Sequence, residues 1–482
     1  MLLSKLAKKT ESKLIGGDVD INRIEYDSRR VVPGNLFVCV NGTFLDGHKF
    51  AESAVKNGAG ALLVERELPF GVPQVIVPDT RIAMAEMAAE LYEQPAKGIT
   101  IIGVTGTNGK TTTTYMLKSI FERAGHRVGL IGTIRNLVGN AVIPTTHTTP
   151  ESVELMRIFR IMRDAGVDVI VMEVSSQALD QNRAHGIEYT VGGFTNLTQD
   201  HLDYHKTMEN YLRAKRKMFE NSKFAVVNAD DKSSAPLIDG LGIGSMTYGI
   251  NNDSDIHASN IEAHPKGIEY DLSHDGMVDH VVVNIPGLFN VYNSMLAAAI
   301  ALKLGVDMKD ILGGLSSVRG VSGRMEALNT EGFDFSVILD FAHTPDGLFN
   351  ILAAVHEFAR GRVIAVFGCG GDKDKTKRPI MGRIAGSGAD YCIVTSDNPR
   401  TENPMEIIDM VLEGVNQTDC PYEVIENRRD AIDRALHIAK KGDVIVLAGK
   451  GHETYQEING IKHPFDEKLI VSELLAEMRK EG

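Results

Sequence analysis

The sequence contains no tryptophan, has only four cysteines, and has no apolar run long enough to cross a bilayer. Residues 1–9 also lack the apolar core and cleavage site of a secretory signal. The cysteines are Cys39, Cys369, Cys392 and Cys420. Because their spacing shows no pairing, we interpret them as buried thiols of a reducing compartment, rather than as disulfides or a zinc site. A cytoplasmic protein without membrane insertion is expected.

The sequence also has fewer basic residues than acidic ones. The formal net charge is −13, and nucleic-acid-binding surfaces usually need a basic face, so binding to nucleic acid is not expected. A small anionic ligand is still compatible with this charge, because a few local cations and helix N-termini can outweigh it. The length of 482 residues, with 43% apolar and 24% charged residues, is typical of a globular protein with about two to four domains.

The order of apolar and amphipathic segments divides the chain into three blocks. The first block, residues 1–97, has strands at 35–40 and 74–77, a helix at 81–92, and a Pro- and Gly-containing linker at its end. The second, residues 98–326, has apolar strands at 100–104, 127–131, 168–174 and 224–227, antiparallel hairpins within 256–285, and a helix at 293–304. The third, residues 327–482, has strands at 335–339, 363–367, 391–395 and 443–447 and helices at 345–358 and 431–439. This alternation predicts an α/β protein with mainly parallel sheets.

The most informative motif is a Gly-rich turn between an apolar strand and a helix. Its residues are Thr105, Gly106, Thr107, Asn108, Gly109, Lys110, Thr111 and Thr112. Glycines allow backbone N–H groups to surround phosphate oxygens, Lys110 adds a cation, and the Thr111 hydroxyl can bind Mg²⁺. Val104 stands where the common Walker A pattern has its first glycine. The loop predicts ATP binding, and the alternative is a Gly-rich turn without a ligand.

Other polar residues also follow predicted strands. Glu173 ends a strand of the second block, where its carboxylate can provide a second contact to Mg²⁺. The segment 196–205 concentrates two His and two Asp, for which a functional role and a surface or capping role are about equally expected. Four polar turns follow strands of the third block, at 340–345, 368–374, 397–400 and 449–453. Open α/β sheets bind ligands at this edge, so the four turns together favour a site.

These motifs resemble those of the Mur ligases over essentially the whole chain. The Thr-Gly-Thr-Asn-Gly-Lys-Thr loop is typical of the superfamily, which also contains the folylpolyglutamate synthetases. More specific are Asp27-Ser28-Arg29, Asp46-Gly47-His48, Thr148-Thr149-Pro150, Glu173-Val174-Ser175-Ser176 and the third-block turns, in this order. Within the family, the chain resembles the branch that adds the third residue of the peptide.

The resemblance implies three domains: a UDP-binding α/β N-terminal domain, a central P-loop ATPase domain with a mainly parallel sheet, and a Rossmann-like C-terminal domain. It implies a UDP-muramoyl-dipeptide site formed by Ser28, Asp46, His48, Thr148, Thr149, Ser175, Gln181 and Arg183. Asn293, Arg324, Asp340 and His343 would join the loop around ATP. The amino acid would contact Lys373, Asp397, Asn398, Pro399, Arg400, Gly449 and Glu453.

The resemblance also implies the catalytic residues and the cofactors, ATP and Mg²⁺. Lys110, Lys215, His201 and Glu173 would be catalytic, and Mg²⁺ would be bound by Thr111, Glu173, His201 and Lys215. Lys215 would do so as a carbamate, because a protonated lysine cannot coordinate Mg²⁺ whereas a carbamate offers two oxygens and a negative charge. The sequence itself, without the resemblance, supports no more than an ordinary lysine of a basic helix.

The implied reaction adds meso-2,6-diaminopimelate to UDP-N-acetylmuramoyl-L-alanyl-D-glutamate through an acyl phosphate, on the way to peptidoglycan, and a monomer is expected to carry it out. The Asp-Asn-Pro-Arg turn resembles the version in diaminopimelate-selecting members. The chemistry agrees, because Arg400 can bind a distal carboxylate with two hydrogen bonds. Lys373 replaces the family's commoner arginine and keeps only its charge. The alternatives are L-lysine or another diamino acid as the amine, a folate-extending ligase, and a non-catalytic nucleotide-binding protein.

Overall fold

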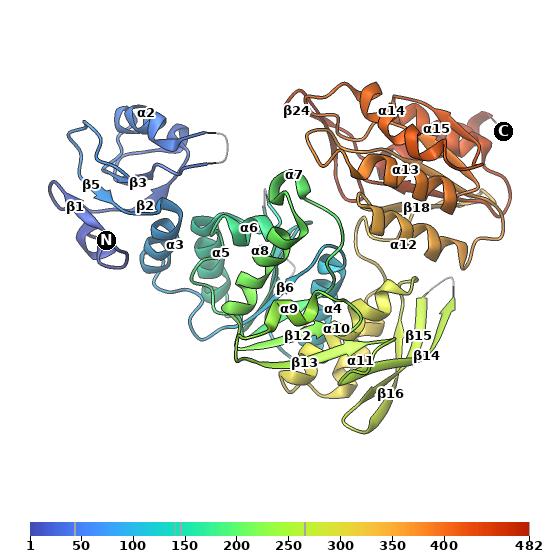
Figure 1. Ribbon diagram of the computed structural model, residues 1–482, viewed down its shortest axis with the longest axis horizontal. Helices are drawn as coiled ribbons and strands as arrows, with labels where there is room; N and C mark the ends of the chain where they lie inside the picture. The colour runs from blue at the N-terminus through green and yellow to red at the C-terminus, as the bar shows by residue number, and fades with distance from the viewer. Residues whose placement is uncertain (43–44, 140, 145–146, 265–266, 482) are drawn as a thin grey trace.

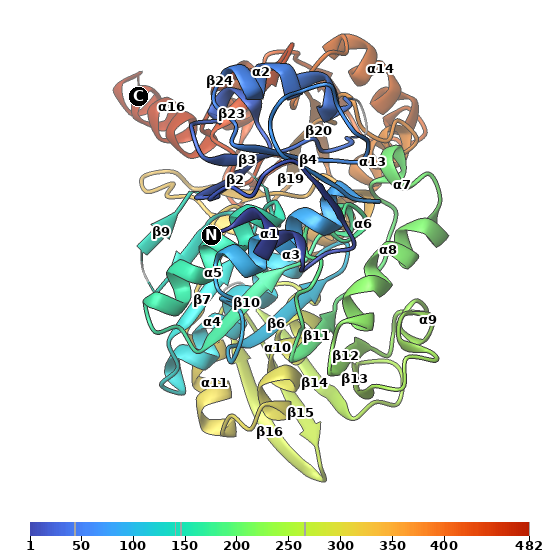
Figure 2. The ribbon, with the colours of Figure 1, turned by 90° about the vertical axis from the view of Figure 1, so that its left-hand side faces the viewer.

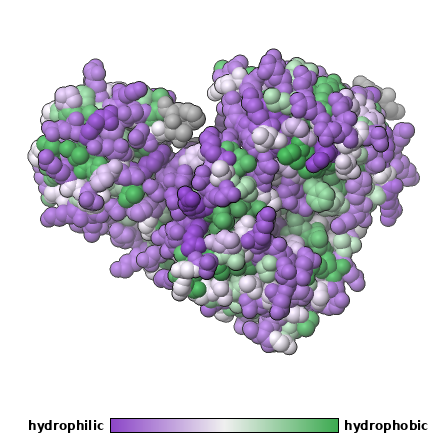
Figure 3. Space-filling model, viewed as in Figure 1, coloured by the Kyte–Doolittle hydropathy of each residue, from purple (hydrophilic) through white to green (hydrophobic). Residues whose placement is uncertain are grey.

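The computed structural model describes residues 1–42, 45–139, 141–144, 147–264 and 267–481. Three α/β domains form three lobes, with the first and third above the central one (Figures 1 and 2). The surface is hollowed between the two upper lobes, as Figure 3 shows. The predicted α/β class with mainly parallel sheets is confirmed. Within the described ranges, no helix is long and apolar enough to cross a membrane.

The first domain is a sheet with the order β1-β5-β4-β3-β2, in which only β1 is antiparallel. Its strands are β1 (Lys13–Ile15), β2 (Arg23–Glu25), β3 (Asn35–Val38), β4 (Ala61–Val64) and β5 (Gln74–Ile76). Its helices are α1 (Leu3–Ala7), α2 (Ala51–Lys56) and α3 (Thr80–Leu91). The Asp79 carboxylate caps α3 by accepting hydrogen bonds from two backbone N–H groups. Buried residues of α3 share a core with both this sheet and the central domain, which joins the two domains.

The central domain has one sheet of eleven strands with the order β16-β15-β14-β13-β12-β11-β6-β10-β7-β8-β9. The strands are β6 (Thr100–Thr105), β7 (Val128–Ile131), β8 (Asn136–Val138), β9 (Ala141–Ile143), β10 (Val169–Glu173), β11 (Val191–Phe194), β12 (Phe224–Asn228), β13 (Gly244–Gly249), β14 (Ile256–His264), β15 (Gly267–His274) and β16 (Met277–Val283). Along the sheet, the neighbouring strands β14-β13-β12-β11-β6-β10-β7 are parallel. The predicted antiparallel hairpins are formed by β14, β15 and β16. The parallel strands bring the ends of β6, β7, β10 and β11 to one edge.

Helices cover both faces of this sheet. They are α4 (Lys110–Arg123), α5 (Ser152–Asp164), α6 (Ser176–Asp180), α7 (Leu202–His205), α8 (Met208–Glu220), α9 (Ser234–Ile238), α10 (Phe289–Lys303) and α11 (Met308–Ser317). Successive strand residues point to opposite faces, and the core divides in the same way. Ile102 and Val104 pack with α4 and α10, whereas Ile101 belongs to the cluster that contains α5 and α8 residues.

The third domain is a sheet with the order β17-β18-β22-β19-β20-β21, parallel except for β17. The strands are β17 (Glu326–Ala327), β18 (Ser336–Asp340), β19 (Val363–Phe367), β20 (Tyr391–Val394), β21 (Tyr422–Val424) and β22 (Val444–Ala448), and β23 (Tyr455–Ile458) and β24 (Ile461–Pro464) form a hairpin. The helices are α12 (Pro345–His356), α13 (Lys377–Gly388), α14 (Pro404–Val415), α15 (Arg428–Ile438) and α16 (Glu467–Glu481). The four predicted strands are present, and their polar turns lie at one edge.

The cysteines differ in part from the expectation. All four are free thiols, and Cys39, Cys369 and Cys392 are buried, but Cys420 is only half-buried. The Cys420 sulfur lies 3.7 Å from the Cys392 sulfur, although the spacing along the chain gave no sign of pairing. The pairing of β20 with β21 brings them together. The Cys392 N–H donates to the carbonyl of Pro421, which is the residue after Cys420.

Buried charges connect the central and third domains. Lys377 Nζ, at the start of α13, lies 3.4 Å from Asp200 Oδ1 and donates to the His343 carbonyl at 2.9 Å. The two charged side chains are only 5% and 7% exposed. Nearby, the Gln199 amide donates to Asp374 at 3.2 Å. These contacts hold the polar edge of the third sheet against the loop that follows β11.

Replacing Lys377 with Met should weaken the docking of the third domain. Loss of one partner of a buried ion pair costs about 3–5 kcal/mol, and separating the domains would let water reach the Asp200 carboxylate. We expect small-angle X-ray scattering to give a larger radius of gyration for the variant than for the wild type. Lys375→Met is the matched control, because that lysine is exposed and pairs with Glu402 inside the third domain. An unchanged radius in Lys377→Met would contradict the role given to this pair.

Candidate active site

The Gly-rich loop begins at the end of β6 and continues into α4. Gly106 and Gly109 have φ angles of 150° and 86°, which glycine adopts without strain. A Cβ atom at Gly106 would collide with the Thr195 hydroxyl, and one at Gly109 with the Asn293 side chain. The loop therefore needs glycine at both positions for two reasons, its backbone conformation and the close approach of its neighbours.

Two lysines bind the main chain of this loop. Lys110 Nζ donates to the carbonyls of Gly106 and Thr107 at 2.9 and 2.8 Å. Lys215, fully buried on α8, donates to the same Gly106 carbonyl at 2.8 Å. Burial lowers the pKa of both lysines, and for Lys215 the nearby charge of Lys110 lowers the pKa further. Two lysine amino groups thus share one carbonyl at the point where the loop would approach phosphate.

The carboxylate of Glu173 is the centre of the hydrogen bonds beside the loop. Glu173 is 1% exposed at the end of β10. Its Oε2 accepts from the Thr111 hydroxyl at 3.0 Å and from the Thr133 hydroxyl at 2.8 Å, and its Oε1 accepts from the Thr133 N–H at 2.9 Å. Arg324 Nη2 in turn donates to the Thr111 hydroxyl at 3.3 Å. Thr133 was not among the predicted residues, although it follows a predicted strand and the rule applied to Glu173 would have included it.

Five predicted residues gather on the other side of Glu173: Thr148, Thr149, Ser175, Gln181 and Arg183. The Thr149 hydroxyl donates to the Glu173 carbonyl at 2.9 Å and accepts from the Ser175 N–H at 3.0 Å. Arg183 donates to the Gln181 side chain at 2.6 Å and to the Thr149 carbonyl at 3.3 Å. The Thr148 and Thr133 hydroxyls lie 3.1 Å apart. A continuous path of hydrogen bonds thus runs from the phosphate loop to this cluster.

His201 lies in the loop that contacts the third domain. Its φ angle is 55°, and its Nε2 is 3.2 Å from the Asp200 carboxylate. Burial, with the nearby charges of His343, Lys110 and Lys215, lowers its pKa, so the ring is neutral at pH 7 and can offer a lone pair.

The donor atoms fit a partial Mg²⁺ site rather than a complete one. In the described part of the chain, no group of three His, Cys, Asp or Glu side chains is arranged to hold a metal ion. The Thr111 hydroxyl and the Glu173 carboxylate are oxygen donors in contact with each other. Mg²⁺ prefers such ligands and usually completes its shell with water and substrate phosphates. These two side chains therefore fit Mg²⁺ that arrives with a nucleotide.

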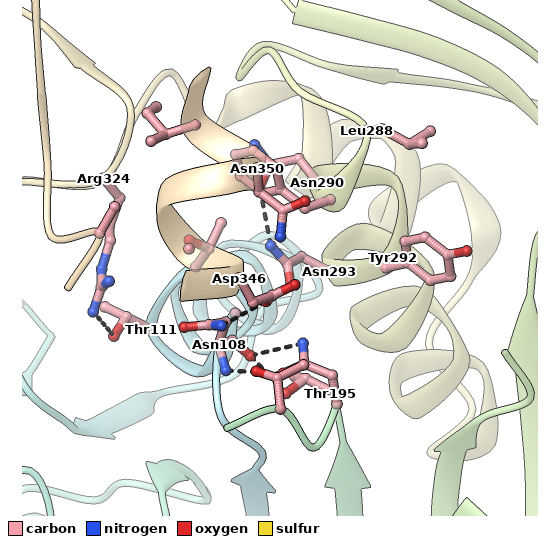
Figure 4. Close-up of a pocket in the computed structure, with 18 of the residues that line it drawn as sticks. Asn108, Thr111, Thr195, Leu288, Asn290, Tyr292, Asn293, Arg324, Asp346 and Asn350 are labelled. Carbon is pink, nitrogen blue, oxygen red and sulfur yellow. Dashed lines mark hydrogen bonds between the residues drawn. The ribbon is translucent and has the colours of Figure 1, made fainter. Parts of the chain in front are cut away.

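A cavity of about 540 Å³ opens next to the loop, between the central and third domains. Figure 4 shows Asn293 and Tyr292 on one side, from α10, and Asp346 and Asn350 on another, from α12. The predicted residues Asn108, Gly109, Thr111, Thr112, Asn293, Arg324 and Asp340 line it, and His343 does not. Asn108 Nδ2 donates to the Asp346 carboxylate at 2.7 Å, which closes the cavity at the loop. Asp346 was not predicted, because only the docked domains reveal this contact.

The predicted amino-acid residues form a second cluster at the edge of the third sheet. Asn398 Nδ2 donates to Glu453 Oε2 at 2.9 Å. Arg400 has a φ angle of 52°, and its Nη1 donates to the Gly371 carbonyl at 2.7 Å. A Cβ at Gly449 would lie 2.6 Å from Asp397 Oδ2.

The other two predicted residues of this group lie next to Gly370 and Gly371. The Pro399 carbonyl packs against Gly371 so closely that a Cβ atom on Gly371 would collide with the carbonyl oxygen. Lys373 belongs to the same turn as Gly371 and is half-buried.

The predicted residues of the first domain lie apart from these clusters. Ser28 is buried at the start of a short 3₁₀ helix, Ser28–Arg30. His48 Nδ1 lies 2.6 Å from Asp46 Oδ1, and its Nε2 accepts from the Glu65 N–H at 3.0 Å. The other Asp46 oxygen accepts from Arg66 at 2.9 Å. Both ring nitrogens of His48 are therefore used within the domain, and a direct ligand contact for it stays a prediction.

Three protein-family profiles match consecutive parts of the chain. They are described as "Mur ligase family, catalytic domain" at residues 20–102, "Mur ligase middle domain" at 104–301, and "Mur ligase, glutamate ligase domain" at 323–451. The UDP-N-acetylmuramoyl-L-alanyl-D-glutamate–2,6-diaminopimelate ligase of Caldanaerobacter subterraneus subsp. tengcongensis is 48% identical, with 100% of both chains covered. Ligase 1 of that name from Clostridium acetobutylicum is 47% identical and covers 99% of this chain and 100% of its own.

Solved structures agree with these matches. The structure of a ligase with the same name has a TM-score of 0.67 at 32% identity, with 95% of each chain covered. The MurF ligase of Thermotoga maritima in complex with ADP shares the fold, with a TM-score of 0.66 at 19% identity over 95% of this chain and 98% of that one. The chain belongs to the Mur ligase family.

Proposed function

We propose that this protein adds meso-2,6-diaminopimelate to UDP-N-acetylmuramoyl-L-alanyl-D-glutamate at the expense of ATP, in the synthesis of peptidoglycan precursors. The observation that carries the proposal is the path Thr111–Glu173–Thr133–Thr148, which connects the phosphate loop to the cluster around Thr149. Such a path sets a nucleotide and a second substrate at a fixed separation. Relatives named for this reaction, 43–48% identical over nearly the whole chain, support the same conclusion.

Amide formation from a carboxylate and an amine is uphill in water, so the carboxylate must first be activated. In the proposed sequence, a γ-carboxylate oxygen of the D-glutamate residue attacks the γ-phosphorus of ATP, ADP leaves, and an acyl phosphate forms. The amine then attacks the acyl carbon, and inorganic phosphate leaves with the carboxylate oxygen. Lys110 would stabilise the transferring phosphoryl group, and Thr149, Ser175 and Arg183 would orient the dipeptide.

Thr111 and Glu173 would hold Mg²⁺, and we propose His201 and carbamylated Lys215 as further ligands. When bound, the ion would offset the negative charge of the phosphate oxygens. The lowered pKa of Lys215 favours its neutral amine, which is the form that reacts with carbon dioxide to give a carbamate. Glu173 would keep the Thr111 hydroxyl oriented throughout.

The third domain would bind the incoming diamino acid. Arg400 is proposed to bind its distal carboxylate, and Asp397 and Glu453 its distal ammonium group. Ser28 and Asp46 would contribute to the UDP site, and the cavity between the domains would take ATP. The domain boundaries at 97/98 and 326/327 are part of the proposal. One chain holds every proposed residue, which favours a monomer, and free thiols together with ATP use favour the cytoplasm.

Lys110→Ala should abolish most of the activity. Loss of a donor that stabilises transition-state charge lowers kcat by about 100- to 1000-fold. We expect this drop in phosphate release with ATP, UDP-muramoyl-dipeptide and meso-diaminopimelate. Lys118→Ala is the control, because Lys118 lies on the same helix and pairs with Glu122 away from the loop. A Lys110→Ala enzyme that forms the tripeptide near the wild-type rate would rule out the proposed role.

The choice of amine tests the proposal as a whole. With UDP-muramoyl-dipeptide, we expect phosphate release to depend on meso-diaminopimelate and to be much slower with L-lysine. Arg400→Lys should raise the KM for diaminopimelate by about 10- to 100-fold, because a two-point contact with a carboxylate is lost. Its effect on L-lysine should be small, since that amine has no distal carboxylate.

Other outcomes of the same panel would favour the alternatives. Faster reaction with L-lysine would contradict the assignment of Arg400. Activity only with a folate and glutamate would indicate a folate-extending ligase. ATP binding without amine-dependent phosphate release would indicate a non-catalytic protein.

A further inference from the structure

Lys450 lies in the turn after β22, and its side chain is completely buried. A buried ammonium group must be hydrogen-bonded or paired with a charge. Its Nζ donates to Asn398 Oδ1 at 3.0 Å and to Glu453 Oε2 at 3.3 Å. The rings of Tyr455 and Phe465 lie 5.8 Å from Nζ and enclose it from other directions. The lysine therefore contacts two residues of the proposed amino-acid cluster and is shielded from solvent.

Asn398 and Glu453 are also bonded to each other, so the three side chains form a closed triangle. Asn398 Nδ2 donates to Glu453 Oε2 at 2.9 Å, and its Oδ1 additionally accepts from the Glu457 N–H at 2.9 Å. Lys450 offers only donors, which forces the Asn398 oxygen toward it and the amide nitrogen toward Glu453. Lys450 and the Glu457 N–H thus fix the Asn398 amide together, and Lys450 also contacts Glu453.

The cluster also contains a carboxylate oxygen that is unsatisfied. Asp397 is 8% exposed, and its Oδ2 has no hydrogen-bond partner among the described residues. The charged groups that face Asp397 are Lys450, Arg428 of α15 and Arg400. Glu453 faces Arg428 as well, while Glu467 of α16 pairs with Arg428 at 2.7 Å. Burial alone would raise the pKa of Asp397, and the strongest opposing influence is the charge of Lys450.

We propose that Lys450 is a positioning residue for the diamino-acid substrate. It holds Asn398 and Glu453 in their binding orientation and keeps the Asp397 carboxylate charged, so that this carboxylate can bind an ammonium group. Because its side chain is completely buried, Lys450 would not touch the substrate. This inference rests on the proposed function, and it adds Lys450, which lies within the predicted turn at 449–453 but is not among the proposed contacts.

Lys450→Met tests the inference, because methionine keeps much of the side chain's length and removes the charge and the donors. We expect the KM for meso-diaminopimelate to rise by about 10- to 100-fold, as for the loss of hydrogen bonds to a charged group. The KM values for ATP and UDP-muramoyl-dipeptide should stay unchanged. The acidic limb of kcat/KM for diaminopimelate should move to higher pH, because without the cation Asp397 takes up a proton at a higher pH.

Two further variants make the result specific. Lys462→Met is the matched control, since that lysine is exposed and lies 3.9 Å from the Tyr455 ring centroid, and it should behave as the wild type. Lys450→Gln keeps a hydrogen-bond donor without the charge, and it should show the same shift of the acidic limb. If Lys450→Met does not fold, Lys450→Gln provides the test in its place.

The outcomes separate this inference from the proposed function. If the wild type forms no product with any diamino acid, the proposed function fails. If the wild type is active but the KM for diaminopimelate and the acidic limb are unchanged in both Lys450 variants, the positioning role is overturned. A parallel rise of all three KM values would also overturn it, because it would indicate a general loss of structure.

Discussion

The buried carboxylate of Glu173 is the constraint on which the rest of the site depends. A charged group at 1% exposure needs partners, and they come from the phosphate loop through Thr111 and from the end of β7 through Thr133. Strand β10 lies between β6 and β7 in parallel register, so their carboxyl ends must meet at this point. Because Thr149 binds the main-chain carbonyl of Glu173, the cluster around Thr149 is fixed to the same residue. Glu173 thus sets the separation between the Gly-rich loop and this cluster, through its side chain and its main chain together.

The third domain completes the site from another body. The Lys377–Asp200 pair and the Asn108–Asp346 hydrogen bond join its polar edge to the central loops, and the cavity lies between them. In the proposed reaction, phosphoryl transfer belongs to one domain and the amine to the other, so the acyl phosphate is exposed to amine and protected from water only when the domains are docked. Buried charges such as Lys377 and Asp200 suit reversible docking of the domains. They pair with each other when the domains are docked, and water would solvate them if the domains separated.

The sequence was sufficient for the local features, and tertiary contacts explain the rest. Strand β19 has the predicted bounds, and the Gly-rich turn lies between strand and helix as expected. Strand β11 was not predicted, because Gly192 and Gly193 interrupt its apolar pattern; a Cβ there would meet side chains of α8 and α10, which pack against its two faces. Lys377 and Lys450 act through Asp200 and Asn398, which lie far away in the chain, and no spacing in the sequence reveals such pairs. The predicted binding roles, in contrast, came from the family resemblance.

The fate of one oxygen atom tests the proposed chemistry most directly. UDP-muramoyl-dipeptide would be labelled with oxygen-18 in the γ-carboxylate of its D-glutamate, and the released phosphate analysed by mass spectrometry during turnover with meso-diaminopimelate. An acyl phosphate transfers one carboxylate oxygen to phosphorus, so each phosphate released should carry one labelled oxygen. Unlabelled phosphate, released together with tripeptide product, would show that the carboxylate never attacked ATP and would contradict the account.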